Sequence, residues 1–164
     1  MMKLIDDIRR RFRHPESGER KLRLREVSQY EDVTQGTEYV YHIEDADSGQ
    51  QIGRMELRLG HDKAIDFLGN VGYSILPAYR GHHYAAKACR LLAPIARAKG
   101  MDYVTITCDT DNEPSRKTIE SLGAQYLGKL ERRVFLGPGR SYAHEKFNYR
   151  WDLPADPQQG RADG

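Results

Sequence analysis

The sequence changes its periodicity at Pro77, and this change constrains the fold more than any other feature. Before Pro77, apolar and polar residues alternate over several short stretches, and this period of two is typical of half-buried strands. Strands are expected at residues 20–27, 37–45, 51–60 and 65–77. The polar turn around Gly49 joins the second and third stretches as a hairpin. This half of the chain therefore predicts antiparallel strands.

After Pro77 the apolar spacing becomes helical. Residues 84–99 predict an amphipathic helix that ends at Gly100, and residues 102–109 predict a strand rich in β-branched side chains. A second helix follows, with Asn112 as its N-cap and Gly123 as its stop. Two more strands are expected at 125–136 and 142–153. A strand, a helix and a strand in succession indicate a right-handed crossover and a parallel strand pair.

The length of 164 residues suits one domain, expected over residues 1–153, with a helix and loop in residues 1–20 and a disordered tail at 154–164. No apolar run reaches the ~18 residues that span a bilayer, and the N-terminus does not resemble a secretory signal. The net charge of +2 does not indicate nucleic-acid binding. Two cysteines favour reduced thiols, so we expect a cytoplasmic protein that binds neither membrane nor nucleic acid.

The turn between Pro77 and the first long helix is a candidate anion site. The N–H groups of residues 81–86 have no partner within a helix, and the helix dipole adds partial positive charge there. The alternative is an ordinary strand-to-helix turn that binds nothing. Adjacent side chains such as His82 and His83 cannot readily point at one ion, so no metal site is expected.

The stretches "YRGHHYAAKA" and "DYVTITCDTDNEPSRKTIESLGA" resemble the GNAT superfamily of acyl-CoA-dependent N-acyltransferases. The family motif [QR]-x-x-G-x-[GA] is matched at Arg80 and Ala85. The motif N-x-x-[AS] is matched at Asn112 and Ser115, and the helix after it closes in Leu122-Gly123. The resemblance implies an α/β (α+β) fold: a mixed, mostly antiparallel sheet of about seven strands, helices on both faces, and fourth and fifth strands that splay apart.

The resemblance also implies acetyl-CoA as co-substrate. The amides of residues 81–86 would bind its diphosphate, and the fourth strand, around residues 73–76, would pair with the pantetheine arm. Asn112 would contact that arm, with help from Ser115. The residues expected at the cofactor are Ser74, Ile75, Leu76, Arg80, Gly81, His82, His83, Tyr84, Ala85, Ala86, Asn112 and Ser115.

The sequence departs from the family pattern at three positions. His83 stands where the family usually has glycine; a helical conformation would accommodate it, with its ring N–H as a candidate hydrogen-bond donor to phosphate. The alternative is an ordinary surface histidine. Ile119 occupies the position of a tyrosine that serves as general acid, and Asn70 that of a glutamate that serves as general base. Three other candidates for the chemistry are Asp66, Glu56 and Tyr73. Each has a structural alternative: solvated strand carboxylates for Asp66 and Glu56, and packing for Tyr73.

The predicted function is transfer of an acetyl group from acetyl-CoA to a primary amine by direct attack. A backbone N–H near Ile75 is implied as the oxyanion donor. Cys108 is a weak alternative nucleophile, because it is expected to be buried in a strand.

The acceptor is not identified by the sequence. Only about ten residues join the first two strands, where the family usually has two helices that wall the acceptor site. The N-terminal helix, the turn at 137–141 or another subunit of a homodimer must supply that wall. The alternatives to an enzyme are a non-catalytic acyl-CoA-binding sensor or interaction module and, more weakly, a scaffold with an empty loop.

Overall fold

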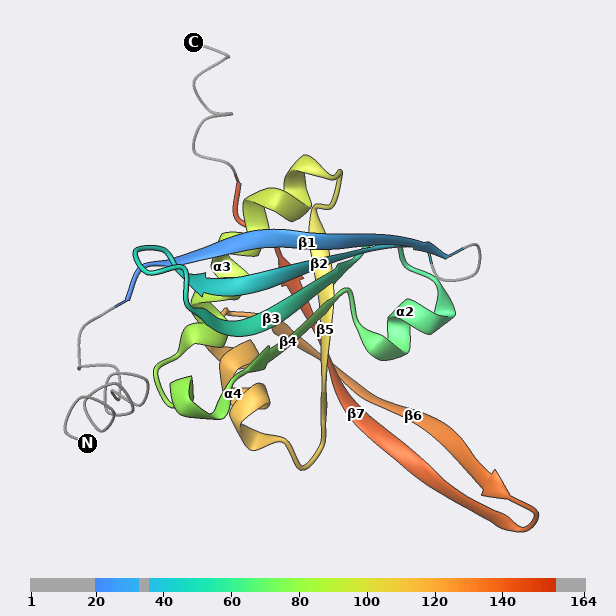
Figure 1. Ribbon diagram of the computed structural model, residues 1–164. Helices are drawn as coiled ribbons and strands as arrows, with labels where there is room; N and C mark the ends of the chain where they lie inside the picture. The colour runs from blue at the N-terminus through green and yellow to red at the C-terminus, as the bar shows by residue number, and fades with distance from the viewer. Residues whose placement is uncertain (1–19, 33–35, 156–164) are drawn as a thin grey trace, which may run out of the picture.

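The computed structural model describes residues 20–32 and 36–155, which form one seven-stranded sheet in the order β1-β2-β3-β4-β5-β7-β6 (Figure 1). The strands are β1 (Leu22–Asp32), β2 (Gly36–Asp45), β3 (Gln51–Arg58), β4 (Val71–Ile75), β5 (Tyr103–Asp109), β6 (Gln125–Gly137) and β7 (Arg140–Asp152). Every neighbouring pair is antiparallel except β4 and β5. The expected mixed, mostly antiparallel sheet is confirmed. The helix expected near the N-terminus and residues 156–164 of the expected tail lie outside the described residues.

The helices lie on both faces of the sheet, as expected. They are α2 (Lys63–Leu68), the 3-10 turn η1 (Pro77–Tyr79), α3 (Tyr84–Ala98) and α4 (Glu113–Ser121). The buried residues of α3 and α4 belong to one core on one face, whereas α2 packs against β5 on the other, where Thr107 Oγ1 donates to the carbonyls of Phe67 and Leu68. In the described part of the chain, no helix has the length and apolar character needed to cross a bilayer.

The strand predicted at residues 65–77 is wrong in its first half. Residues 63–68 form α2, because the Asp62 carboxylate caps the turn and accepts a hydrogen bond from Ile65 N–H at 2.9 Å. Gly69 ends the helix with a φ of +80°. The strand begins only at Val71, so Asp66 is an exposed residue on a helix and not a strand carboxylate.

The connection between β1 and β2 is also shorter than expected, because both strands continue into it. Residues Ser28 to Asp32 pair with Val40 to Gly36, and only residues 33–35 join them. The two strands therefore form a long hairpin at one edge of the sheet, and β6 and β7 form another that extends past the other strands (Figure 1).

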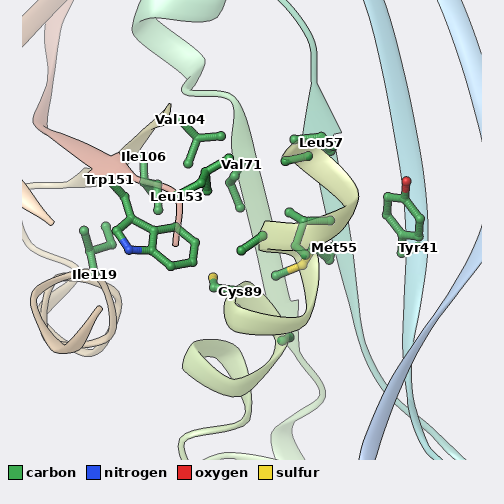
Figure 2. Close-up of a cluster of buried hydrophobic side chains, with 14 of the residues drawn as sticks. Tyr41, Met55, Leu57, Val71, Cys89, Val104, Ile106, Ile119, Trp151 and Leu153 are labelled. Atoms are coloured by element: carbon green, nitrogen blue, oxygen red, sulfur yellow. The ribbon is translucent and has the colours of Figure 1, made fainter. Parts of the chain in front are cut away.

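The hydrophobic core lies between the sheet and α3. Alternate residues of the central strands point toward this helix, whose small Ala88 and Cys89 allow close packing. Figure 2 shows Met55 and Leu57 on one side of the cluster and Ile119 with Trp151 on the other. Pro94 lies on the exposed side of α3, where its missing N–H is least disruptive. The core thus fixes α3 and α4 beside the ends of β4 and β5.

The other face of β1–β3 carries charged side chains. Arg23 and Arg25 both pair with Glu44, at 2.9 and 2.7 Å. On β3, Arg54 and Arg58 both pair with Glu56, at 3.1 and 2.6 Å. This face is held by ion pairs between β1 and β2 and within β3.

Candidate functional site

The sheet opens between β4 and β5. These parallel strands are paired only at Val71 and Ile106, whereas β3 and β4 remain paired as far as Ile75. Beyond Val71 the edge of β4 that faces β5 therefore has no partner strand in the described chain. The splayed fourth and fifth strands expected from the sequence are present.

The backbone of β4 presents hydrogen-bonding groups to this opening. Leu76 N–H donates to Ile52 O on β3, at 2.9 Å, so the even-numbered residues of β4 face β3. Neighbouring residues of a strand direct their backbone groups to opposite sides. The N–H groups of Tyr73 and Ile75 consequently point toward β5. Ile75 O is already engaged, because it accepts a hydrogen bond from Arg80 Nε at 2.9 Å.

The turn after β4 contains two left-handed residues. Gly81 has a φ of +85°, which glycine adopts without strain, and a Cβ there would meet no atom within 4 Å. His83 has φ +58° and ψ +25° and is the N-cap of α3. The expectation that His83 is helical is wrong: it adopts the left-handed conformation for which glycine is the usual residue, and histidine is among the side chains that tolerate it best.

The first turn of α3 has free N–H groups. The first backbone bond of the helix runs from Lys87 N–H to His83 O at 3.1 Å, and no side chain caps the terminus. The N–H groups of Tyr84, Ala85 and Ala86 therefore have no acceptor within the helix. Turns with left-handed residues gather N–H groups into anion-binding hollows, and the helix dipole adds to this effect.

The side chains of this turn differ in exposure. His82 and His83 are exposed, whereas Tyr84 is buried and its ring stacks on that of His82 at 5.4 Å between centroids. Arg80 is used to hold the end of β4 through Ile75. Both histidines are thus exposed, and the candidate anion donors are the backbone N–H groups of the turn.

Asn112 and Ser115 lie together at the start of α4, where Ser115 contacts β4. Asn112 Oδ1 accepts a hydrogen bond from Ser115 N–H at 3.2 Å, which makes it the expected N-cap. Ser115 Oγ lies 2.8 Å from the hydroxyl of Tyr73, so β4 and α4 are linked. Burial raises the pKa of the Tyr73 hydroxyl well above its usual range, and this group therefore stays neutral.

Two of the three positions that depart from the family pattern, Asn70 and Ile119, are structural. Asn70 is fully buried, and its Nδ2 donates to the carbonyls of Arg58 and Gly60 at 3.0 and 2.8 Å. Its Oδ1 accepts hydrogen bonds from N–H and Oγ1 of Thr105 at 2.7 and 3.0 Å. Ile119 is fully buried in the core. Neither residue is a proton-transfer group.

The other predicted candidates are separated from one another. Both oxygens of Glu56 are occupied by arginines, Oε1 by Arg54 and Oε2 by Arg58. A Cβ at Gly72 would come within 2.8 Å of Glu56 Oε2, so the glycine makes room for this ion pair. Asp66 lies on α2. Tyr73 is the one of the three whose side chain points toward α4 and Ser115.

The alternative nucleophile, Cys108, is buried in β5. Desolvation raises the pKa of its thiol, which disfavours the reactive thiolate. Among the described residues, no group of three potential ligands could hold a metal ion.

A histidine and an aspartate that the sequence analysis did not select meet at the end of β5. His144 Nε2, on β7, lies 2.7 Å from Asp109 Oδ1. The two residues are 35 positions apart, and their contact depends on the register of β5 and β7, in which Asp109 is opposite Lys146. The signal in the sequence was weak: an aspartate directly after an apolar strand and a lone histidine in a later one.

Comparisons with known proteins agree with this geometry. The family model described as acetyltransferase (GNAT) domain matches residues 5–125. No curated protein sequence matches the chain.

Among solved structures, a ribosomal-protein-S5-alanine acetyltransferase from Vibrio fischeri has a TM-score of 0.55 and 16% identity, covering 71% of this chain and 62% of that one. RimL, a ribosomal L7/L12 alpha-N-protein acetyltransferase, has a TM-score of 0.56 and 18% identity, covering 73% and 72%. The microcin C7 self-immunity acetyltransferase MccE, in complex with acetyl-CoA and AMP, has a TM-score of 0.55 and 18% identity, covering 71% and 61%. The chain spans about three fifths of the length of the first and third. These likenesses are evidence of a shared fold.

Proposed function

The chain belongs to the GNAT acetyltransferase family, and from that premise we propose that it transfers an acetyl group from acetyl-CoA to a primary amine by direct attack. The observation that carries the proposal is the opening beside β4, because it leaves backbone N–H groups of Tyr73 and Ile75 facing an unpaired edge. The hollow at residues 81–86 lies directly after it in the chain. A thioester with a diphosphate group needs both features.

In this proposal the diphosphate accepts hydrogen bonds from the free N–H groups at the start of α3. The pantetheine arm lies along β4 as an added strand, and Asn112 and Ser115 border it. One β4 N–H, at Tyr73 or Ile75, donates to the oxyanion of the tetrahedral intermediate. The acetyl-CoA complex of MccE, a similar fold, supports this class of co-substrate.

Tyr73 and Ser115 have a limited chemical role here. A thiol pKa of about 8.5 makes thiolate a fair leaving group at neutral pH, and a phenol with a raised pKa does not give up its proton to it. We therefore assign the Tyr73–Ser115 pair to hydrogen bonding with the departing sulfur rather than to general acid catalysis. Glu56 and Asp66 stay as predictions without a contact that supports them.

The cofactor site is tested with Gly81→Pro. Proline cannot adopt a φ near +85°, so the hollow must change shape. Calorimetry with CoA should show affinity lower by at least about 30-fold, the loss of one charge-assisted hydrogen bond of about 2 kcal/mol. The matched control is Gly49→Pro, because Gly49 has a φ of +73° in the distant β2–β3 turn. Unchanged affinity in the Gly81 variant would remove the diphosphate assignment.

The reaction is tested by thiol release from acetyl-CoA. The acceptors are a hexapeptide with a free N-terminal alanine, a peptide with a free lysine amine, spermidine and kanamycin. Thiol release that depends on one of these amines supports the enzyme. CoA binding without turnover of any of them favours the acyl-CoA-binding sensor. The structural roles of Asn70 and Ile119 are the observation in favour of that alternative.

A further inference from the structure

We propose that His144, oriented by Asp109, is the general base that takes the proton from the acceptor amine. This inference rests on the proposed function and adds to it the group that the Asn70 position does not supply. His144 is the catalytic residue, and Asp109 is the positioning residue that acts through it.

The hydrogen bond between the two side chains fixes which ring nitrogen can accept a proton. A carboxylate only accepts hydrogen bonds, so the His144 Nε2 that lies 2.7 Å from Asp109 Oδ1 carries the hydrogen. In the neutral ring, Nδ1 is then the nitrogen with the lone pair that can accept a proton. The His144 side chain is 34% exposed, so a solute can reach it. A neutral imidazole held in one tautomer is suited to general base catalysis near neutral pH.

Along the strand direction, the His144–Asp109 pair is level with the opening between β4 and β5. Asp109 is three residues beyond Ile106, the residue of β5 that pairs with β4, which is about 10 Å along a strand. Tyr73 and Ile75 are two and four residues beyond Val71, or about 7 and 13 Å along β4. A thioester carbonyl bound by either N–H is therefore level with Asp109.

The pair also lies on the face where a base is required. Side chains alternate along β5, and Cys108 is buried on the side of α3 and α4, so Asp109 points to the opposite face. Tyr73 and Ser115 lie on the α4 side. The group beside the departing sulfur and the group beside the attacking amine consequently stand on opposite sides of the thioester.

The surroundings of His144 come from four elements, α2, β5, β6 and β7. Phe67 of α2 meets its ring edge-on, at 5.5 Å between centroids. Arg132 of β6 is its cross-strand partner, and Lys146 of β7 lies 3.9 Å from Asp109 Oδ1. These groups, with Asp109 of β5, are the charged and aromatic neighbours of the His144 ring. All but Phe67 and Asp109 lie beyond residue 125, where the family match ends.

The step balances without a further reactant. The nitrogen of the neutral amine forms a bond to the thioester carbon, and the C–S bond of acetyl-CoA breaks. The proton of the amine passes to Nδ1 of His144 and then to water. CoA leaves as a thiolate, which keeps the electron pair of the broken bond.

The test compares His144→Gln and Asp109→Asn with the control His42→Gln, on β2, where His42 contacts Arg25. The readouts are the kcat and KM for thiol release with the alanine hexapeptide or whichever panel amine reacts, over pH 5–9. His144→Gln should lower kcat about 100-fold or more, leave the KM for acetyl-CoA unchanged, and remove the acid limb of the kcat profile. Asp109→Asn should lower kcat less, and free imidazole should partly restore the activity of His144→Ala.

Each outcome decides between the two proposals. If the wild-type protein acetylates an amine and His144→Gln keeps a kcat within threefold and the same pH profile, the general base is not His144 and the proposed function stands. If the wild-type protein binds CoA but acetylates no amine of the panel, the proposed function fails and the base assignment fails with it. Loss of CoA affinity in His144→Gln would indicate a structural role and would also overturn the inference.

Discussion

The buried side chain of Asn70 holds three segments of the sheet together. Its amide links the end of β3, the Gly60 turn and β5 through four hydrogen bonds, just before the sheet divides. A carboxylate could not replace it, since two of its partners are carbonyl oxygens. The position at which the family usually has a general base therefore holds the strands together here, and proton transfer needs another residue.

We predict that Asn70→Asp lowers the free energy of unfolding by at least about 3 kcal/mol at pH 7. The change places a buried carboxylate against the carbonyls of Arg58 and Gly60. Urea unfolding followed by circular dichroism measures it. Asn112→Asp, at an exposed helix cap, is the control and should stay within about 0.5 kcal/mol of wild type. Equal stability of the two variants would contradict the role given to Asn70.

The start of α3 requires a left-handed backbone conformation at a position occupied by histidine rather than glycine. His83 in the left-handed region costs of order 1 kcal/mol relative to glycine. The strain is tolerated because the buried first turn of α3, with Tyr84, Ala85 and Ala86, fixes the helix in place. The backbone thus keeps the shape of a glycine turn without the glycine.

We predict that His83→Gly raises the free energy of unfolding by up to about 1 kcal/mol and does not weaken CoA binding. The gain comes from relief of the left-handed conformation, offset in part by the greater freedom of glycine in the unfolded chain. Thermal unfolding and calorimetry are the measurements. His82→Gly is the matched control, since its φ is not positive, and it should give no gain. A clear loss of CoA affinity in His83→Gly would show that the ring itself binds phosphate.

At the scale of the whole molecule, the fold was predictable where the pattern was local. Most strand periods, the α3 face and the Asn112 cap followed from short stretches of sequence, and the splayed pair followed from the resemblance to the family. The helix α2 was missed because Ile65, Phe67 and Leu68 read equally well as the start of a strand, and the Asp62 cap decided otherwise. The His144–Asp109 pair was missed because cross-strand register, not sequence spacing, brings it together.

Two buried carboxylates of β2, Glu44 and Asp45, make the stability of the fold depend on pH. Hydrogen bonds from Arg25 and Arg23 hold the pKa of Glu44 below its usual range. The N–H of Ser48, the Arg20 guanidinium and the N–H of Asp47 do the same for Asp45. A carboxylate whose pKa is lower in the folded state stabilises it above the unfolded pKa, about 4, and this contribution is lost as pH falls through the folded value.

We predict that wild-type stability falls below about pH 4, and that Glu44→Gln makes this fall shallower while lowering stability at pH 7. Urea midpoints between pH 2.5 and 7 measure both effects. Glu31→Gln, at an exposed carboxylate, is the control and should leave the slope unchanged. A slope that is the same in Glu44→Gln and wild type would show that the arginine pairs do not contribute.

The single residue pair between β4 and β5, Val71 with Ile106, affects how ligand binding changes the stability of the sheet. Apart from this pair, the β1–β4 and β5–β7 portions are joined in the described chain by packing against α3 and α4, by α2 against β5, and by the hydrogen bonds of Asn70 to Thr105. A ligand bound along β4 would add hydrogen bonds and packing contacts between the two portions of the sheet, so it would stabilise the fold as well as serve as a substrate. At a ligand concentration 100 times its Kd this linkage adds about 2.7 kcal/mol of resistance to unfolding. The rigidity of such a protein would then follow the supply of its co-substrate, with amide exchange in β4 and β5 slowing as the ligand accumulates.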